Sequence, residues 1–224
     1  MPFAKGHENS VRTSPSATLL STRVVAVLRA QDARDYAPVI AALQQGGVLS
    51  IELTLSTAGV FTELPVLQKQ FGSDLEIGVG TVTSVEEAET ALALGAAFLV
   101  TPTTEPDVIT ACTRRGVPVY PGGLTPTELH TGWKTGATAV KVFPASTVGA
   151  GYISQLRGPF PDLEIIPSGG VNIEDVPSWI EAGALAVSLG GPLIGDAFKG
   201  GDLAQLTARA RRVRALVEQT EAKQ

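Results

Sequence analysis

Cysteine and histidine are scarce in this sequence, and the shortage excludes several kinds of site. With one cysteine, Cys112, the chain can form neither an internal disulfide nor a thiolate metal cluster, which fits a reducing compartment. The two histidines, His7 and His130, are too few for a histidine-rich zinc site, and they make a Ser-His-Asp triad a poor hypothesis. We therefore expect no bound metal and no hydrolase triad.

Charge and long apolar runs are scarce as well. Charged residues make up 17% of the chain and the net charge is −5, so nucleic-acid phosphates find no basic surface beyond one short run with the pattern of a solvated last helix. That run comprises Arg209, Arg211, Arg212 and Arg214. No apolar run approaches the roughly 20 residues that span a bilayer, and residues 1–13 form a polar tail instead of a signal core. We expect a cytoplasmic protein that binds neither nucleic acid nor a membrane.

Apolar residues are abundant, at 44%, which is enough for one large domain over residues 14–224. Eight short β-branched and apolar runs predict strands at 24–28, 49–54, 75–80, 97–101, 117–121, 138–143, 163–168 and 184–189. Segments with helical spacing lie between them, such as 32–45, 84–94, 105–115 and 172–182. A short helix is expected within 13–22 and a closing helix over 202–219.

The repeat length predicts the architecture. Strand starts lie about 20 to 26 residues apart, which is what a strand, a helix and two short loops consume. Glycines that end helices just before strands, in "ALALGAAFLV", "GWKTGATAV" and "WIEAGALAV", support the repeat. Eight units predict a single (β/α)8 TIM barrel with a short N-terminal helix. A doubly wound sheet is the alternative, but no Gly-rich fingerprint follows the first strand, where Leu28, Arg29 and Ala30 stand.

Strand parity places two charged residues inside such a barrel. Val140 and Val142 share one parity and suit the helix-facing side, which turns Lys141 toward the barrel mouth. On the second strand, Ile51 and Leu53 form the apolar parity, and Glu52 points inward with Ser50 and Thr54. A desolvated lysine becomes a neutral amine that can attack a ketone. From spacing alone, a buried Lys141–Glu52 ion pair is an equally good interpretation.

Two glycine pairs follow the seventh and eighth strands. They are Gly169 and Gly170 in "PSGGVN", before a helix expected to be capped by Asn172, and Gly190 and Gly191 in "LGGPLIG". Barrels bind phosphate at these two places, so the pairs together favour a phosphorylated substrate. Thr81 and Pro102 also lie at the rim, where turn residues are common, and Cys112 is expected to be inert packing within a helix.

These motifs together resemble those of the 2-keto-3-deoxy-6-phosphogluconate (KDPG) and 4-hydroxy-2-oxoglutarate aldolase family. The resemblance covers about residues 19 to 217 and is carried by "AVLR", "IELTLST", "GVGTVTS", "VTPT", "PGGLTPTEL", "KVFPAS", "GPFPDLEIIPSGGVN" and "LGGPL". It implies a class I aldolase, a homotrimeric (β/α)8 barrel of Entner–Doudoroff carbohydrate metabolism that needs no cofactor. Its small-molecule substrate would be a 2-oxo acid, namely a 2-keto-3-deoxy-6-phospho sugar acid cleaved to pyruvate and glyceraldehyde 3-phosphate, with 4-hydroxy-2-oxoglutarate as a second implied substrate.

The resemblance also assigns roles to residues. Lys141 matches the Schiff-base lysine and Glu52 the general acid/base. Substrate contacts are implied for Arg29, Thr54, Thr81, Pro102 and Phe143, and phosphate contacts for Ser168, Gly169, Gly170, Gly190 and Gly191. Two departures weaken anion binding: Ser56 stands where many members have arginine, and Pro192 where many have serine.

Two alternatives stay open beside the aldolase. A phosphate-binding barrel isomerase, or an enzyme similar to thiamine phosphate synthase, would keep the glycine loops and have no need of Lys141. A non-catalytic, oligomerising scaffold would use Lys141 and Glu52 only to neutralise each other.

Overall fold

The computed structural model describes residues 12–223, so most of the expected polar tail, residues 1–11, lies outside the described residues. Its strands are short and parallel. They are β1 (Val24–Leu28), β2 (Ser50–Thr54), β3 (Glu76–Gly80), β4 (Leu99–Val100), β5 (Val119–Tyr120), β6 (Gly122–Gly123), β7 (Val140–Val142), β8 (Ile165–Pro167) and β9 (Val187–Leu189). Each of the eight predicted runs contains a strand.

The strands form two parallel sheets instead of the single expected one. Six strands pair in the order β5-β4-β3-β2-β1-β9, and three in the order β6-β7-β8. The predicted strand 117–121 ends early because Pro121 has no N–H to donate, and β6 follows directly after it. Backbone contacts link the two sheets at both edges. The Thr138 N–H donates to the Val119 carbonyl at 3.0 Å, and Ser168 forms a parallel bridge with Ser188.

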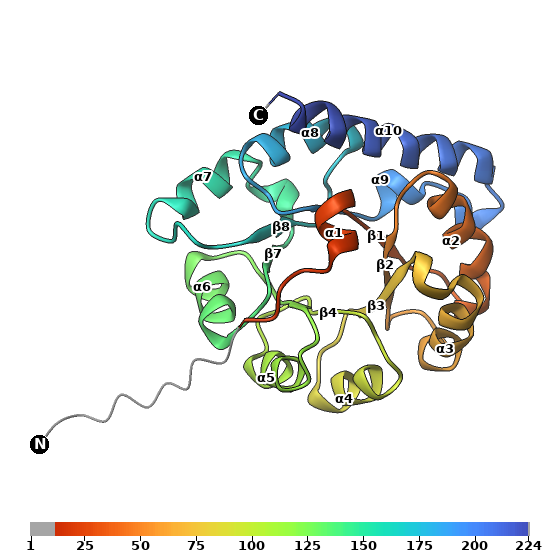
Figure 1. Ribbon diagram of the computed structural model, residues 1–224, viewed down its shortest axis with the longest axis horizontal. Helices are drawn as coiled ribbons and strands as arrows, with labels where there is room; N and C mark the ends of the chain where they lie inside the picture. Colours follow the sequence, from red (N-terminus) through yellow and green to blue (C-terminus); the bar gives the residue numbers. More distant parts are fainter. Residues whose placement is uncertain (1–11, 224) are drawn as a thin grey trace, which may run out of the picture.

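Helices surround the strands on all sides in Figure 1, with the short helix α1 lying across one end. The α-helices are α1 (Ala17–Thr22), α2 (Tyr36–Gln45), α3 (Val60–Phe71), α4 (Val85–Ala93), α5 (Pro106–Arg114), α6 (Pro126–Thr135), α7 (Gly151–Arg157), α8 (Val176–Glu181), α9 (Gly191–Ile194) and α10 (Leu203–Glu221). Single 3-10 turns are η1 (Ala33–Asp35), η2 (Gly72–Asp74), η3 (Ala145–Thr147), η4 (Ile173–Asp175) and η5 (Ala197–Lys199). None of the helices within residues 12–223 has the length and apolar content needed to cross a membrane.

Local sequence explains where several helices begin and end. Ser84 with Glu87, and Thr125 with Glu128, form reciprocal capping boxes at the starts of α4 and α6. Gly136 ends α6 at φ 110°, a conformation that a side chain disfavours. Asn172 does not cap a helix as expected: its amide donates to the Asp175 carboxylate at 2.9 Å, and the turn η4 follows instead of a regular first helical turn.

The core has two layers, as the strand parity predicts. The larger apolar cluster lies between strands and helices and includes Val140, Val142, Ile51 and Leu53. A smaller cluster uses the opposite strand faces. Its buried members are Leu19, Val25, Phe98, Val100, Tyr120, Ala139, Ile166 and Ala186. Because α1 contributes Leu19 to this cluster, the short helix closes the end of the strand assembly opposite the strands' carboxyl ends.

Candidate active site

Lys141 lies in the middle of β7 with its side chain turned away from the helices. Its neighbours Val140 and Val142 belong to the larger apolar cluster, and Lys141 itself is 7% exposed. The Lys141 N–H donates to the Pro121 carbonyl at 2.8 Å, which fixes β7 against β6. A lysine is almost never this buried without a charged partner or a function.

Glu52 occupies the equivalent place on β2. It is 3% exposed, and its neighbours Ile51 and Leu53 lie in the larger cluster. Its carboxylate lies over Gly80 at the end of β3: a Cβ added to Gly80 would come within 1.9 Å of Glu52 Oε1. The absence of a side chain at Gly80 therefore leaves the space that the carboxylate fills.

Lys141 and Glu52 face one small cavity. Its volume is about 10 Å³, close to the ~10–15 Å³ that one water molecule needs. The remaining lining residues are Val25, Val100, Tyr120, Ile166 and Ser188. Two residues 89 positions apart in the sequence, each inward by parity, thus meet in the same apolar space.

Burial shifts both groups toward their neutral forms. Desolvation lowers the pKa of Lys141, an effect that the Glu52 charge opposes and the Arg29 charge reinforces. Desolvation raises the pKa of Glu52, while the positive charges of Lys141 and Arg29 oppose the rise. Among the described residues, neither Lys141 nor Glu52 takes part in an ion pair within 4.0 Å. The simple buried ion pair is therefore a poor description of this site.

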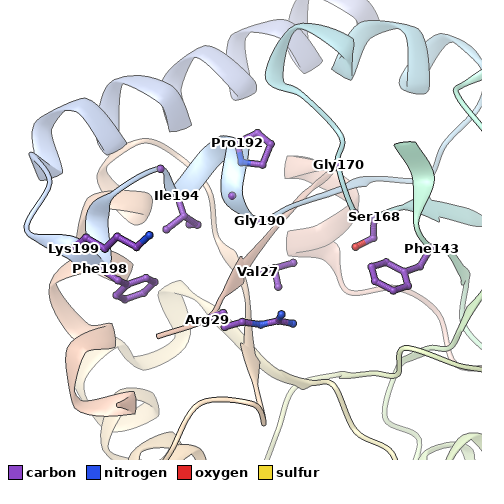
Figure 2. A pocket seen from close by; sticks show the side chains of 13 residues that line it. Val27, Arg29, Phe143, Ser168, Gly170, Gly190, Pro192, Ile194, Phe198 and Lys199 are labelled. Carbon is purple, nitrogen blue, oxygen red and sulfur yellow. The ribbon is translucent and has the colours of Figure 1, made fainter. Parts of the chain in front are cut away.

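A larger cavity of about 380 Å³ opens next to the lysine. Phe143 connects the two spaces, because Lys141 Nζ lies 5.0 Å from the centre of its ring and the ring lines the larger cavity. Figure 2 shows Phe143 at one side of this cavity and Lys199 at the other, with the Arg29 side chain extending between them. Within residues 12–223, Arg29 and Lys199 are the charged lining residues, and no carboxylate lines the cavity.

The two glycine loops form the rest of the wall. Gly169, Gly170, Gly190 and Gly191 all line the cavity, as predicted. Outside regular helices and strands, no hydrogen bond within the described residues has one of these N–H groups as its donor, which favours their availability to an anion. The Gly169 backbone also packs against the Phe143 ring, where an added Cβ would approach to 2.8 Å.

A hydrogen-bonded pair of hydroxyl groups lies between the two cavities. Ser168 lines the larger cavity and Ser188 the smaller one, and their Oγ atoms lie 3.2 Å apart. Both side chains are buried, at 7% and 3% exposed. Two hydroxyls that hydrogen-bond to each other keep one proton available for a further acceptor.

Three predicted site residues do not line either cavity. Thr54 is fully buried, and its hydroxyl donates to the Leu28 carbonyl at 2.9 Å. Thr81 follows β3 and has φ 60°, which is rare for a β-branched residue and is typical of strain at functional loops. The backbone of Pro102 packs closely against Gly122. All three lie at or just beyond the carboxyl ends of strands.

The structure adds residues that the sequence alone does not single out. Gly80 makes room for the carboxylate, Ser188 and Tyr120 line the space around Lys141, and Lys199 lies across the larger cavity from Phe143. Cys112 is buried in α5, where desolvation raises the pKa of the thiol to about 12, in line with inert packing.

This arrangement suits one class of chemistry. A desolvated amine, a carboxylate within the same cavity and an anion-binding pocket beside them are the groups that an enzyme needs to attack a ketone and stabilise the resulting iminium. They define the site of a Schiff-base enzyme acting on an anionic carbonyl compound.

Comparison with known proteins agrees with this class of enzyme. Residues 16–209 match the family model described as KDPG and KHG aldolase. A 2-dehydro-3-deoxy-phosphogluconate aldolase of Treponema pallidum is 31% identical over 198 residues, covering 87% of this chain and 93% of the relative. A 2-dehydro-3-deoxy-6-phosphogalactonate aldolase of Escherichia coli is 30% identical over 187 residues, covering 83% and 89%. The chain belongs to the KDPG and KHG aldolase family.

A solved structure extends the similarity to the chemistry. KDPG aldolase from Legionella pneumophila, described with pyruvate captured as a covalent carbinolamine intermediate, has a TM-score of 0.79 and 26% identity over 88% of this chain and 96% of that one. The protein is accordingly a lyase, a class I aldolase. This assignment decides against the isomerase, the enzyme similar to thiamine phosphate synthase and the non-catalytic scaffold.

Proposed function

We propose that this enzyme cleaves a 2-keto-3-deoxy-6-phospho sugar acid to pyruvate and glyceraldehyde 3-phosphate, with Lys141 as the Schiff-base residue and Glu52 as the proton carrier. The observation that carries the proposal is the shared cavity of Lys141 and Glu52 beside a pocket with two cations and no carboxylate. The names of the relatives support this class of substrate.

The steps follow from the positions of these groups. The neutral Lys141 Nζ attacks the C2 ketone, and Glu52 supplies the proton that removes the C2 oxygen as water, leaving a protonated imine. Glu52, now a carboxylate, takes the C4 hydroxyl proton through a water. The C3–C4 bond then breaks, its electrons enter the imine to form an enamine, and the aldehyde leaves. Protonation at C3 and hydrolysis release pyruvate and free Lys141.

The larger cavity would hold the rest of the substrate. Phe143, Thr54, Thr81 and Pro102 are proposed to surround the pyruvate end. The phosphate is proposed to bind at the residues Ser168, Gly169, Gly170, Gly190, Gly191 and Arg29. Pro192 lines the same pocket but has no N–H to donate, and the Ser56 hydroxyl donates to Thr54 at 3.1 Å. Neither departure removes the glycine N–H groups from the pocket.

We further propose that the two sheets form one closed (β/α)8 barrel within a single domain over residues 14–224. Support comes from the bridge between Ser168 and Ser188 at one junction and the hydrogen bond from Thr138 to Val119 at the other. A closed barrel would hold Lys141 and Glu52 at a fixed separation. The homotrimer that the resemblance implies and the cytoplasmic location that the sequence favours stay predictions.

Trapping of the imine tests the proposed role of Lys141. The enzyme is incubated with pyruvate, reduced with borohydride and digested, and the peptides are analysed by mass spectrometry. We expect a pyruvate-derived adduct on the Lys141 peptide, and none in Lys141→Met. An unmodified Lys141 peptide in the wild-type protein, or an adduct on another lysine, would overturn the assignment. Pyruvate release from the two C4 epimers, the gluconate and galactonate acids, identifies the preferred substrate.

A further inference from the structure

We propose that Lys199 is a specificity-determining residue, which binds the distal phosphate of the substrate from the wall opposite Lys141. This inference rests on the proposed function and names a contact that the glycine loops do not provide. Lys199 ends the turn η5, and its side chain enters the larger cavity in Figure 2. Among the residues that the structure describes, Lys199 forms no ion pair.

The position of Lys199 determines which part of a bound substrate its side chain can contact. Lys141 must bond to C2, and Phe143, 5.0 Å from Lys141 Nζ, marks the near side of the larger cavity. Lys199 lies on the far side in Figure 2, with Arg29 between them. A chain that starts at Lys141 and crosses the cavity therefore brings its last group to Lys199.

The charge around this far wall favours an anion. The protein carries a net charge of −5, yet the described part of the chain lines the cavity with two cations and no acid. Two acids are equally near in sequence: Asp196 turns its carboxylate toward Gly201, where an added Cβ would come within 2.1 Å of Oδ1, and the Asp202 carboxylate accepts from the Ala204 N–H at 2.8 Å. Neither aspartate lines the cavity, so within residues 12–223 the Lys199 ammonium has no competing carboxylate there.

The neighbouring residues hold Lys199 at this wall. The Lys199 N–H donates to the Asp196 carbonyl at 2.7 Å. Arg209 of α10 donates to the carbonyls of Leu193 and Ile194 at 2.7 and 2.9 Å, which anchors the segment that precedes η5. The Phe198 ring packs edge-on against Tyr36, with ring centres 5.7 Å apart. An otherwise flexible lysine thus extends from an anchored backbone into the pocket.

Binding of a dianion at Lys199 has a measurable consequence for specificity. A phosphate at the far wall gains a charged hydrogen bond that a hydroxyl of the unphosphorylated acid gains only weakly. Lys199 should therefore lower KM for the phosphorylated substrate and affect kcat little, since the contact is far from the reacting carbon.

The test compares Lys199→Met with Lys199→Arg and with a surface control, Lys69→Met on α3. For each protein, kcat and KM are measured with the 6-phosphorylated acid and with its unphosphorylated counterpart. We expect Lys199→Met to lower the preference for the phosphorylated acid about 10-fold, mainly through KM. Lys199→Arg should restore most of the preference, and Lys69→Met should match the wild type.

A binding measurement separates this proposal from the proposed function. Inorganic phosphate is titrated into wild type and Lys199→Met by calorimetry, which requires no reaction at Lys141. Weaker phosphate binding to Lys199→Met supports the contact even if the wild-type Lys141 fails to trap pyruvate. Equal phosphate binding and an unchanged substrate preference in Lys199→Met would overturn the role of Lys199, whatever the imine experiment shows.

Discussion

The carboxylate of Glu52 lies directly over the backbone of Gly80, in the place where any larger residue would put its Cβ. The register explains the contact, because Glu52 pairs with Gly78 on β3 and its side chain extends two residues along that strand. Position 80 thus controls where the proton carrier lies, although glycine itself has no functional group.

The first prediction concerns this contact. Gly80→Ala should displace the Glu52 carboxylate, since the added Cβ would lie 1.9 Å from Oε1. We expect kcat to fall by at least about 10-fold, because proton transfer depends on hydrogen-bond distances that a displacement of this size breaks. The matched control is Gly151→Ala at the start of α7, where an added Cβ meets nothing within 4 Å. Wild-type kcat in a folded Gly80→Ala protein would contradict the prediction.

The second prediction concerns pH. The neutral amine of Lys141 is the reactive form, so the rate of imine trapping should rise with pH to a plateau. The pH at half of the plateau rate, the half-point, should follow the pKa of Lys141, which burial lowers. The Glu52 charge raises this pKa and the Arg29 charge lowers it. Glu52→Gln should therefore shift the half-point to lower pH, and Arg29→Met to higher pH.

Borohydride trapping of pyruvate across a pH series gives both half-points. Each rate is normalised to its own plateau, so that a slower reaction in Glu52→Gln does not obscure the shift. A shift in Glu52→Gln depends on the wild-type Glu52 carboxylate being charged at the half-point, because it is the charged form that raises the pKa of Lys141. Shifts of the same sign in both variants would show that these charges do not set the pKa of Lys141.

The strands are predictable from the sequence because parallel strands are continuous apolar runs, and the inward positions of Lys141 and Glu52 are predictable because strand parity is a local property. Predictions from sequence fail where a side chain's partner depends on tertiary structure. Asparagine is a common N-cap residue, but the Asn172 side chain makes no capping hydrogen bond and its amide donates to the Asp175 carboxylate instead. The predicted strand 117–121 ends early at Tyr120, because Pro121 has no N–H to donate to the ladder.

The residues that sequence reasoning missed depend on contacts across strands. Gly80 belongs to the motif "GVG", whose inward parity is visible, but the approach of Glu52 depends on the register between β2 and β3. Ser188 becomes relevant only because β9 lies beside β8. Lys199 lies in a turn without periodicity, so no sequence pattern directs its side chain into the cavity.

The third prediction concerns the strained residue Thr81. At φ 60° a β-branched residue costs about 1–2 kcal/mol, and asparagine tolerates this conformation better. Thr81→Asn should therefore raise the free energy of unfolding by up to about 1 kcal/mol. If Thr81 contacts substrate as proposed, KM should rise in the same variant. Urea unfolding and steady-state kinetics measure the two effects, and a variant that loses stability would contradict the strain.

The fourth prediction concerns the hydroxyl pair between the two cavities. Ser188→Ala leaves the buried Ser168 hydroxyl without its 3.2 Å partner, and Ser168→Ala does the same to Ser188. Each single variant should lose about 1 kcal/mol of unfolding free energy. The double variant should lose less than the sum, because removing both hydroxyls leaves no unsatisfied group. Additive losses in urea unfolding would mean that the two hydroxyls do not interact. Of the two serines, Ser188 is the one that lines the cavity of Lys141. Ser188→Ala should therefore slow imine trapping of pyruvate more than Ser168→Ala does.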